Sequence, residues 1–241
     1  MLAPPIASSG PPTTNLVSRW EADSLVALAE GDPIGTWADQ SGNGHDATQS
    51  NASLKPWLRT NDFGSKPSVQ FDGSNDILSI AGTISLPAFT VFIVLNAKHW
   101  ISGSDFTVQD YNLTNMLWWH SGIHGFALNG TGGGNQDPHL TTYNTSGTET
   151  NSKRMNSGFL GGKGIFVWTY DGSSIGGRYN GVAKSPSNND GGFGTSNPDN
   201  IGWSYLYTGS RYAAILIYGV ALDSTNISAV ESYLNTKYLV F

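Results

Sequence analysis

Aromatic and histidine side chains occur close together at several points of the chain, and side chains of this kind can bind a sugar. A flat ring stacks on the apolar face of a pyranose, while neighbouring polar groups bond its hydroxyls. The candidate carbohydrate-binding residues are Trp119, His120, His124, Tyr143, Trp203 and Tyr205. Which sugar they would bind is not readable from residue types, and the open alternative is that these rings belong to the hydrophobic core.

Hydrolysis of a sugar would need more than rings, because two carboxyl groups must face one glycosidic bond. The chain has only four glutamates, which are Glu21, Glu30, Glu149 and Glu231. Glu21 and Asp23 are close in sequence but stand outside the strand where a catalytic pair is expected. Asp72 and Asp76 fit a turn better than an acid–base pair. We therefore predict no catalytic residue and a protein that is not an enzyme.

Two groups of residues have side chains that could bind a metal. Asp72 and Asp76 could hold calcium, and His120 and His124 could hold a transition metal. The histidines flank a Ser-Gly-Ile turn, so their spacing does not bring them together as it would on a helix. Because such residues are more often ordinary turn residues, we expect no metal site and no cofactor.

The C-terminal part contains the most apolar strand and the clearest helix. From Tyr212 to Leu222 both alternating faces are apolar, so this strand must be covered on both sides. Asp223 follows as a helix N-cap. The helix should bury a stripe of apolar residues, namely Ile227, Val230, Leu234 and Tyr238. The residues expected to be solvated are Ser228, Glu231, Asn235 and Lys237.

The rest of the chain is typical of short strands separated by turns. Trp20 should anchor the first strand or turn, and the stretch from Trp37 to Ala47 should bury Trp37 while Asp39 binds loop amides. Further strands are predicted over 89–97, 116–119 with 125–128, 165–170, 176–179 and 182–184. The stretch from Val69 to Leu78 predicts a hairpin. Asn180-Gly181 is a strong type I′ hairpin signal, because that turn needs two positive φ angles.

Two stretches, Asn129–Lys163 and Ser185–Asn200, are rich in Gly, Asn, Ser and Thr. We expect both to be long surface loops, and loops of that length usually bind something or pack on a neighbour. The many short strands and the single terminal helix predict an all-β fold, an antiparallel sandwich.

The first fifteen residues form a Pro-rich segment. We divide the chain into an extended arm over 1–15 and one β-sandwich domain over 16–241. The arm has no apolar periodicity that would fold it back on its own domain, so we expect it to bind a capsid or other virion protein, or other copies of the chain. The partner-binding candidates are Pro4, Pro5, Ile6, Pro11 and Pro12.

Composition argues against some classes of partner. The formal net charge is -6, and only 12% of the residues are charged. No basic run is present that would neutralise phosphates or an anionic membrane, so neither nucleic acid nor a membrane is expected as a partner. The start has no positive region followed by an apolar core, so no signal peptide is expected. The absence of cysteine does not identify a compartment.

Four landmarks together resemble the laminin-G-like, concanavalin A-like lectin and glucanase superfamily in its bacterial or phage form. They are Trp37–Ala47, Val69–Leu78, Arg178–Val182, and the C-terminal strand with its helix. The resemblance implies a jelly-roll sandwich of two antiparallel sheets, and it implies little about function, because lectins, adhesion modules, glycosidases and virion proteins share this fold. Hydrolases of the fold usually carry Glu-x-Asp-x-Glu on one strand, and this sequence lacks that motif.

Three function classes remain in view. The leading hypothesis is a non-enzymatic virion surface protein, such as a phage capsid decoration, head-fibre protein or tail adhesin, with a lectin-like domain attached through the arm. The alternative is a free secreted carbohydrate-binding lectin, which would be extracellular. A glycoside hydrolase is the third class and has the least support.

Overall fold

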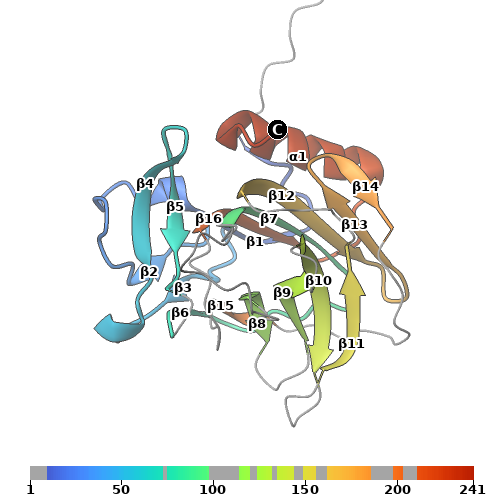
Figure 1. The fold of residues 1–241 in the computed structure, drawn as a ribbon, viewed down its shortest axis with the longest axis horizontal. Helices are drawn as coiled ribbons and strands as arrows, with labels where there is room; N and C mark the ends of the chain where they lie inside the picture. Colours follow the sequence, from blue (N-terminus) through green and yellow to red (C-terminus); the bar gives the residue numbers. More distant parts are fainter. Residues whose placement is uncertain are drawn as a thin grey trace, which may run out of the picture.

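The computed structural model describes residues 10–72, 75–97, 114–119, 124–131, 135–143, 149–155, 162–185, 198–202 and 211–241. These residues form two antiparallel β-sheets that face each other, and one α-helix near the C-terminus (Figure 1). The predicted all-β antiparallel sandwich with a C-terminal helix is therefore confirmed. Among the described residues, no helix has the length and apolar character needed to cross a membrane.

Sheet A has eight described strands, with β7 and β16 at its centre. Its order is β14-β13-β12-β7-β16-β5-β4, and β1 also pairs with β16. Its strands are β1 (Leu16–Glu21), β4 (Trp57–Phe63), β5 (Lys66–Gln70), β7 (Phe89–Ala97), β12 (Gly162–Tyr170), β13 (Ile175–Tyr179), β14 (Val182–Lys184) and β16 (Arg211–Tyr218).

Sheet B also has eight described strands, in the order β11-β10-β9-β8-β15-β6-β3-β2. Its strands are β2 (Thr36–Trp37), β3 (Ala47–Thr48), β6 (Ile77–Ile80), β8 (Thr114–Trp119), β9 (His124–Thr131), β10 (Asn135–Tyr143), β11 (Glu149–Arg154) and β15 (Pro198–Gly202). The predicted pairing of 116–119 with 125–128 is confirmed, since β8 and β9 are antiparallel neighbours.

The central strands of sheet A are buried on both faces, as predicted for the apolar C-terminal strand. In β16, Ile215 and Ile217 lie in the core between the sheets, while Ala213 and Leu216 lie in a second cluster on the outer face. Because β16 is apolar on both sides, it needs a cover on the outer face as well. The strand ends at Tyr218, four residues before the predicted end.

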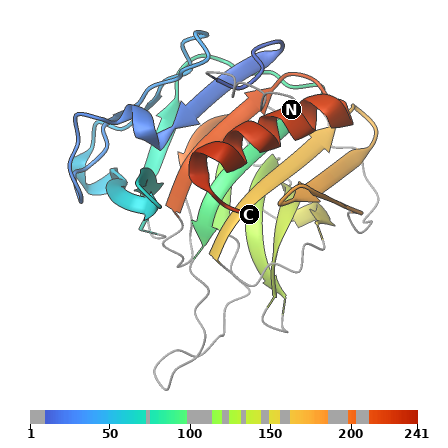
Figure 2. The same cartoon turned by 90° about the horizontal axis from the view of Figure 1, so that it is seen from above.

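Helix α1 (Ser224–Tyr238) provides that cover and lies across the outer face of sheet A (Figure 2). Its N-cap is Asp223, whose carboxylate accepts a hydrogen bond from the Asn226 amide at 2.8 Å. The predicted apolar stripe is confirmed, and its buried residues are Ile227, Val230, Leu234 and Tyr238. The prediction that Glu231 is solvated is wrong. Its side chain is buried beside Arg178 of β13, with Oε2 2.8 Å from the guanidinium.

The predicted hairpin from Val69 to Leu78 is also wrong. Val69 belongs to β5 in sheet A, whereas Leu78 belongs to β6 in sheet B. The intervening turn therefore carries the chain from one sheet to the other. Two apolar strands around a turn give the same local pattern whether the second strand pairs with the first or faces it across the core.

The stretch Asn129–Lys163, predicted to be a surface loop, contains two strands in its described part. β10 and β11 pair with each other, and β10 pairs with β9, so that they extend sheet B to its edge. Edge strands need little apolar surface, because their backbone pairing does not depend on burial of their side chains. Most of the second stretch, residues 186–197, lies outside the described residues.

Local turn predictions hold. Trp20 and Trp37 are fully buried, and the Asp39 carboxylate accepts hydrogen bonds from the amides of Ser41 and His45. The turn between β13 and β14 has φ angles of 46° at Asn180 and 77° at Gly181. Two successive positive values are what a type I′ turn requires.

The end of the Pro-rich segment packs on its own domain. Pro11 is buried, the carbonyl of Pro12 accepts a 2.8 Å hydrogen bond from the Tyr218 hydroxyl, and the carbonyl of Asn15 accepts one from Gly219. This differs from the expectation that the whole arm stays free of the domain. Burial of Pro11 and two hydrogen bonds hold residues 11–15 on the domain, although the segment has no apolar periodicity. Residues 1–9, with Pro4, Pro5 and Ile6, lie outside the described residues.

Candidate functional site

Three candidate sugar-binding residues come together at one end of sheet B. Trp119 is the last residue of β8, His124 the first of β9, and Tyr143 the last of β10. The register places His124 opposite Thr142, the neighbour of Tyr143. Adjacent strands are about 4.8 Å apart, so the three backbone positions span roughly 10 Å. Sheet pairing thus joins residues that are up to 24 positions apart in the sequence.

Strand ends and a neighbouring strand define this end of sheet B. β8 ends at Trp119 and β9 begins at His124, and on the other side of β8 Trp119 pairs with Pro198 of β15. Between Pro198 and Asn200 the pairing shifts register, which marks an irregularity next to the predicted site. Irregular pairing of this kind is common beside functional sites.

The other predicted sugar-binding residues cannot be assigned to the end of sheet B formed by β8, β9 and β10. His120, Trp203 and Tyr205 lie outside the described residues. The chain leaves β15 at Gly202, which pairs with Ile77, whereas Pro198 at the other end of β15 pairs with Trp119. The segment that contains Trp203 therefore begins at the opposite end of β15.

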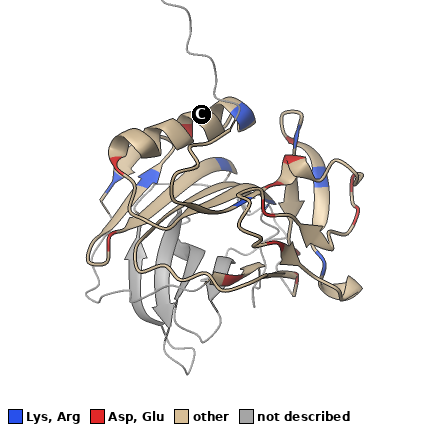
Figure 3. Cartoon of the chain, turned by 180° about the vertical axis from the view of Figure 1, so that it is seen from behind, with Lys and Arg blue, Asp and Glu red and all other residues tan. Residues whose placement is uncertain are grey.

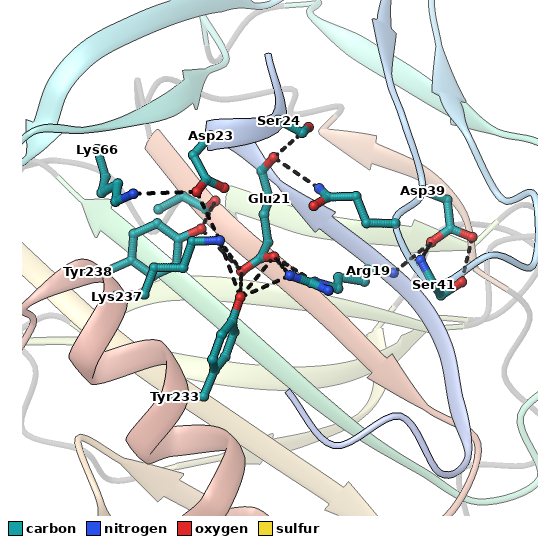
Figure 4. A network of polar contacts seen from close by, with 12 residues as sticks. Arg19, Glu21, Asp23, Ser24, Asp39, Ser41, Lys66, Tyr233, Lys237 and Tyr238 are labelled. Atoms are coloured by element: carbon teal, nitrogen blue, oxygen red, sulfur yellow. Dashed lines mark hydrogen bonds and ion pairs between the residues drawn. The ribbon is translucent and has the colours of Figure 1, made fainter. Parts of the chain in front are cut away.

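Glu21, the last residue of β1, sits in a polar network under helix α1 (Figure 4). Its carboxylate contacts the Arg19 guanidinium, accepts a 2.9 Å hydrogen bond from the Tyr233 hydroxyl and lies 3.0 Å from Lys237 Nζ. Lys237 Nζ is also 2.9 Å from a carboxylate oxygen of Asp23. Both oxygens of Glu21 thus have partners, and its side chain is completely buried.

The pKa shifts of Lys237, Tyr233 and Tyr238 favour the charge states that this network needs. Burial would lower the pKa of Lys237, but the carboxylates of Glu21 and Asp23 outweigh that effect and raise it. Burial and the nearby Glu21 carboxylate raise the pKa of Tyr233 and raise that of Tyr238 strongly. The lysine therefore stays charged and the tyrosines stay neutral, and Glu21 serves to fasten α1 to β1. A sugar cannot reach this carboxylate in the folded state.

The sequence interpretation missed this network. A signal was present, because Glu21 stands between Trp20 and Ala22, and a carboxylate in apolar surroundings needs a cation. Tyr233 and Lys237 are four residues apart on α1, a spacing that places both on one side of a helix. The two features are 212 residues apart, so only the fold joins them.

Asp72 and Asp76 are engaged in the crossing between the sheets. Asp76 Oδ2 accepts a 2.8 Å hydrogen bond from the Asp72 amide, and Asp72 Oδ1 accepts one from the Asn75 amide. These are turn contacts, in keeping with the interpretation that preferred a turn to a calcium site. Within the described part of the chain, no group of three or more acidic, histidine or cysteine side chains is arranged to hold a metal.

Comparison with known proteins gives similarity of fold without similarity of sequence. No protein-family model matches the chain, and no curated protein matches it in sequence. The binding domain of Paraclostridial Mosquitocidal Protein 1 superposes with a TM-score of 0.62 at 13% identity, over 93% of this chain and 53% of that one. Domain 4 of AbnA, a GH43 extracellular arabinanase from Geobacillus stearothermophilus in complex with arabinotriose, gives 0.58 at 13% identity, over 90% and 98%.

A third structure is the botulinum neurotoxin serotype D ligand-binding domain in complex with N-acetylneuraminic acid, with a TM-score of 0.60 at 10% identity over 91% of this chain and 51% of that one. The chain thus spans about half the length of these toxin domains and nearly all of the arabinanase domain. At such low identity the similarity shows the fold alone. The class of fold is the β-sandwich of these binding domains.

Proposed function

We propose that the chain is a non-enzymatic, lectin-like module that binds a carbohydrate at the end of sheet B formed by β8, β9 and β10. The observation that carries the proposal is the register that sets Trp119, His124 and Tyr143 on neighbouring strands. A tryptophan level with a histidine on the next strand is the composition of a sugar site, with a ring for stacking and a polar group for a hydroxyl. Tyr143 is the residue after Thr142, which is opposite His124, so it occupies the alternate position in the register. Two sandwiches of similar fold were solved with sugars bound, which supports the same class of ligand here.

The test compares glycan binding with folding in the same variants. Trp119→Ala, which removes a stacking ring, and His124→Ala, which removes a hydrogen-bond partner, should each weaken binding to a panel of neutral oligosaccharides about tenfold. Their thermal unfolding should match that of the wild type. The control is Phe241→Ala, which removes a ring that is 54% exposed at the C-terminus and should leave binding unchanged.

Two outcomes would contradict the proposal. A loss of stability of roughly 3–5 kcal/mol in Trp119→Ala would mean that this ring is part of the core. New reducing ends in the oligosaccharide panel, formed at a rate proportional to protein concentration, would mean that the protein is an enzyme.

A narrower proposal concerns where the module acts: on a virion surface, held to a capsid protein or to its own copies through residues 1–9. Its support comes from the sequence, where the apolar residues Pro4, Pro5 and Ile6 precede the packed part of the chain, and proline lowers the entropy that a free chain loses on docking. Removal of residues 1–9 should abolish incorporation into particles while the melting temperature stays the same. Removal of residues 1–15 should also lower the melting temperature, because the contacts of Pro11 and Pro12 are lost.

Particles or oligomers that assemble normally without residues 1–9 would favour the alternative, a free extracellular lectin. Analysis of the proteins in purified particles, together with light scattering for the mass of oligomers in solution, shows whether assembly is lost or kept after removal of residues 1–9.

A further inference from the structure

We propose a second binding site, for an acidic glycan, on the outer face of sheet A. It is independent of the site on sheet B. A row of five side chains crosses five neighbouring strands there, and we call it the cross-strand row. Its members are Trp57 in β4, Gln70 in β5, Arg211 in β16, Asn96 in β7 and Lys163 in β12.

Each member of the cross-strand row lies directly opposite the next one in the sheet register. Residues that are directly opposite share a face, and at about 4.8 Å per strand the row is roughly 20 Å long. Neighbours along the strands, such as Leu58, Val69 and Leu95, belong to the core between the sheets. The row therefore points away from that core, and all five of its side chains are partly exposed.

Helix α1 does not cover this part of the outer face. The Tyr238 hydroxyl, in the last turn of the helix, donates to the carbonyl of Ala213, two residues along β16 from Arg211. The helix ends there, beside the cross-strand row. Figure 1 shows β5 and β4 continuing sheet A beyond the helix.

Two acceptors near the row, Gln70 Oε1 and the Asp62 carboxylate, are already used. Gln70 Oε1 accepts from Nε of Arg59 at 2.6 Å and from Nε of Arg211 at 3.2 Å. The buried carboxylate of Asp62 accepts from Arg211, from Asn96 and from the Ser68 hydroxyl. These contacts fix the side chains in place, so that a ligand would meet groups that are held in advance.

Several donors, in contrast, remain without an acceptor among the described residues. They are Nε2 of Gln70, the second terminal nitrogen of Arg59 and of Arg211, and Nζ of Lys163. Lys163 Nζ instead lies 5.1 Å from the centre of the Phe63 ring, which positions the ammonium group but does not neutralise it. Within the described residues the row thus has more spare donors than spare acceptors, which fits a ligand that is rich in acceptors.

The charges point to an anion of low charge density. Arg59 pairs with Glu30 and Arg211 with Asp62, and Lys163 belongs to the same row, so three cations meet two carboxylates in a chain whose net charge is -6. Figure 3 shows basic residues in blue and acidic residues in red, interspersed over the described part of the chain. One excess positive charge is too little for the dense phosphates of a nucleic acid. A polysaccharide with one carboxylate per sugar unit matches better, and its length can follow the row.

Trp57 adds the apolar contact that a sugar needs. Its ring is partly exposed at the end of the row, and the Arg59 guanidinium lies 5.9 Å from the ring centre. A ring held beside a cation can stack on a pyranose whose carboxylate reaches the guanidinium.

The experiment titrates the full chain with sodium polygalacturonate, with neutral dextran and with a single-stranded DNA oligonucleotide. The Trp119→Ala variant, which lacks the proposed sheet B site, should bind polygalacturonate, more weakly as salt is added, and neither of the other two. Arg59→Gln and Lys163→Gln should each weaken this binding about tenfold, because each removes one charge-assisted hydrogen bond. Lys184→Gln is the matched control, since it removes one positive charge on edge strand β14, outside the row.

Arg59→Gln can disturb its contacts with Gln70 and Glu30, so Lys163→Gln serves as the variant with little effect on folding. Trp119→Ala should leave polygalacturonate binding intact, which separates this site from the one on sheet B. The inference is overturned if the wild type does not bind polygalacturonate, if dextran or the oligonucleotide binds Trp119→Ala as tightly as polygalacturonate does, or if Lys184→Gln weakens binding as much as Lys163→Gln does.

Discussion

Asp76 is a carboxyl group whose ionisation is unfavourable in the folded protein. Only 3% of the residue is exposed, in the turn that passes from sheet A to sheet B. Burial and the neighbouring Asp72 carboxylate raise its pKa to about 6, although the hydrogen bond from the Asp72 amide acts in the opposite direction. The crossing therefore contains a group that titrates near neutral pH.

The pH dependence of this group has a definite sign. Because the pKa of Asp76 is higher in the folded than in the unfolded protein, the folded protein binds this proton more tightly. The stability that protonated Asp76 contributes is therefore lost as pH rises from about 4 through about 6. Asp76→Asn has no charge to bury and should be more stable than the wild type at pH 7, by up to about 3 kcal/mol. Urea unfolding at pH 4, 5, 6 and 7 measures the difference, which should shrink toward pH 4. A difference that is constant with pH would contradict the assignment.

Single residues could be predicted where their roles are local. Asp223 caps a helix through an amide three residues away, and Asn180-Gly181 forms its turn from its own φ angles. Glu231 could not be predicted in the same way. Its partner, Arg178, is 53 residues earlier in the chain, and only the packing of α1 on β13 makes burial of that carboxylate possible.

At the scale of elements, α1 is fastened to β1 by charge as well as by apolar contact. The Glu21 carboxylate lies between Arg19 of its own strand and Lys237 of the helix. Removing one member of a buried ion pair leaves the other members without compensation, which is more costly than loss of a pair at the surface.

Two isosteric variants test this difference. Glu21→Gln should lower the free energy of unfolding by roughly 3–5 kcal/mol, because Arg19 and Lys237 lose a buried partner. Glu30→Gln makes the same change in a side chain that is 53% exposed and paired with Arg59, and should cost less than about 1 kcal/mol. Urea unfolding of both variants gives the comparison. Equal losses in the free energy of unfolding would show that the buried network under α1 stabilises the fold no more than the exposed Arg59–Glu30 pair does.

Elements with a strong apolar pattern were predictable, and elements at the edge of a sheet were not. The strand over 89–97 and the C-terminal strand and helix follow from their apolar residues. β10 and β11 consist mainly of polar residues, so only their pairing with β9 reveals them. The turn after Val69 looks like a hairpin, because sequence does not show which sheet receives the next strand.

At the scale of the whole molecule, the two proposed sites differ in chemistry. The end of β8, β9 and β10 combines aromatic residues with a histidine, whereas the cross-strand row on sheet A combines spare donors with one tryptophan. The sequence pointed to the first surface through residue types, but the grouping of Trp119, His124 and Tyr143 depends on strand register. The second surface joins five strands from distant parts of the chain, and no local pattern marks it.

The most direct test of carbohydrate binding by sheet B is to follow backbone amide resonances of the full chain during titration with neutral oligosaccharides, including arabinotriose. We predict saturable shifts that centre on Trp119, His124 and Tyr143, with little change at Lys163 on sheet A. Shifts confined to other parts of the chain, or no shifts with any oligosaccharide at millimolar concentration, would contradict the proposed site.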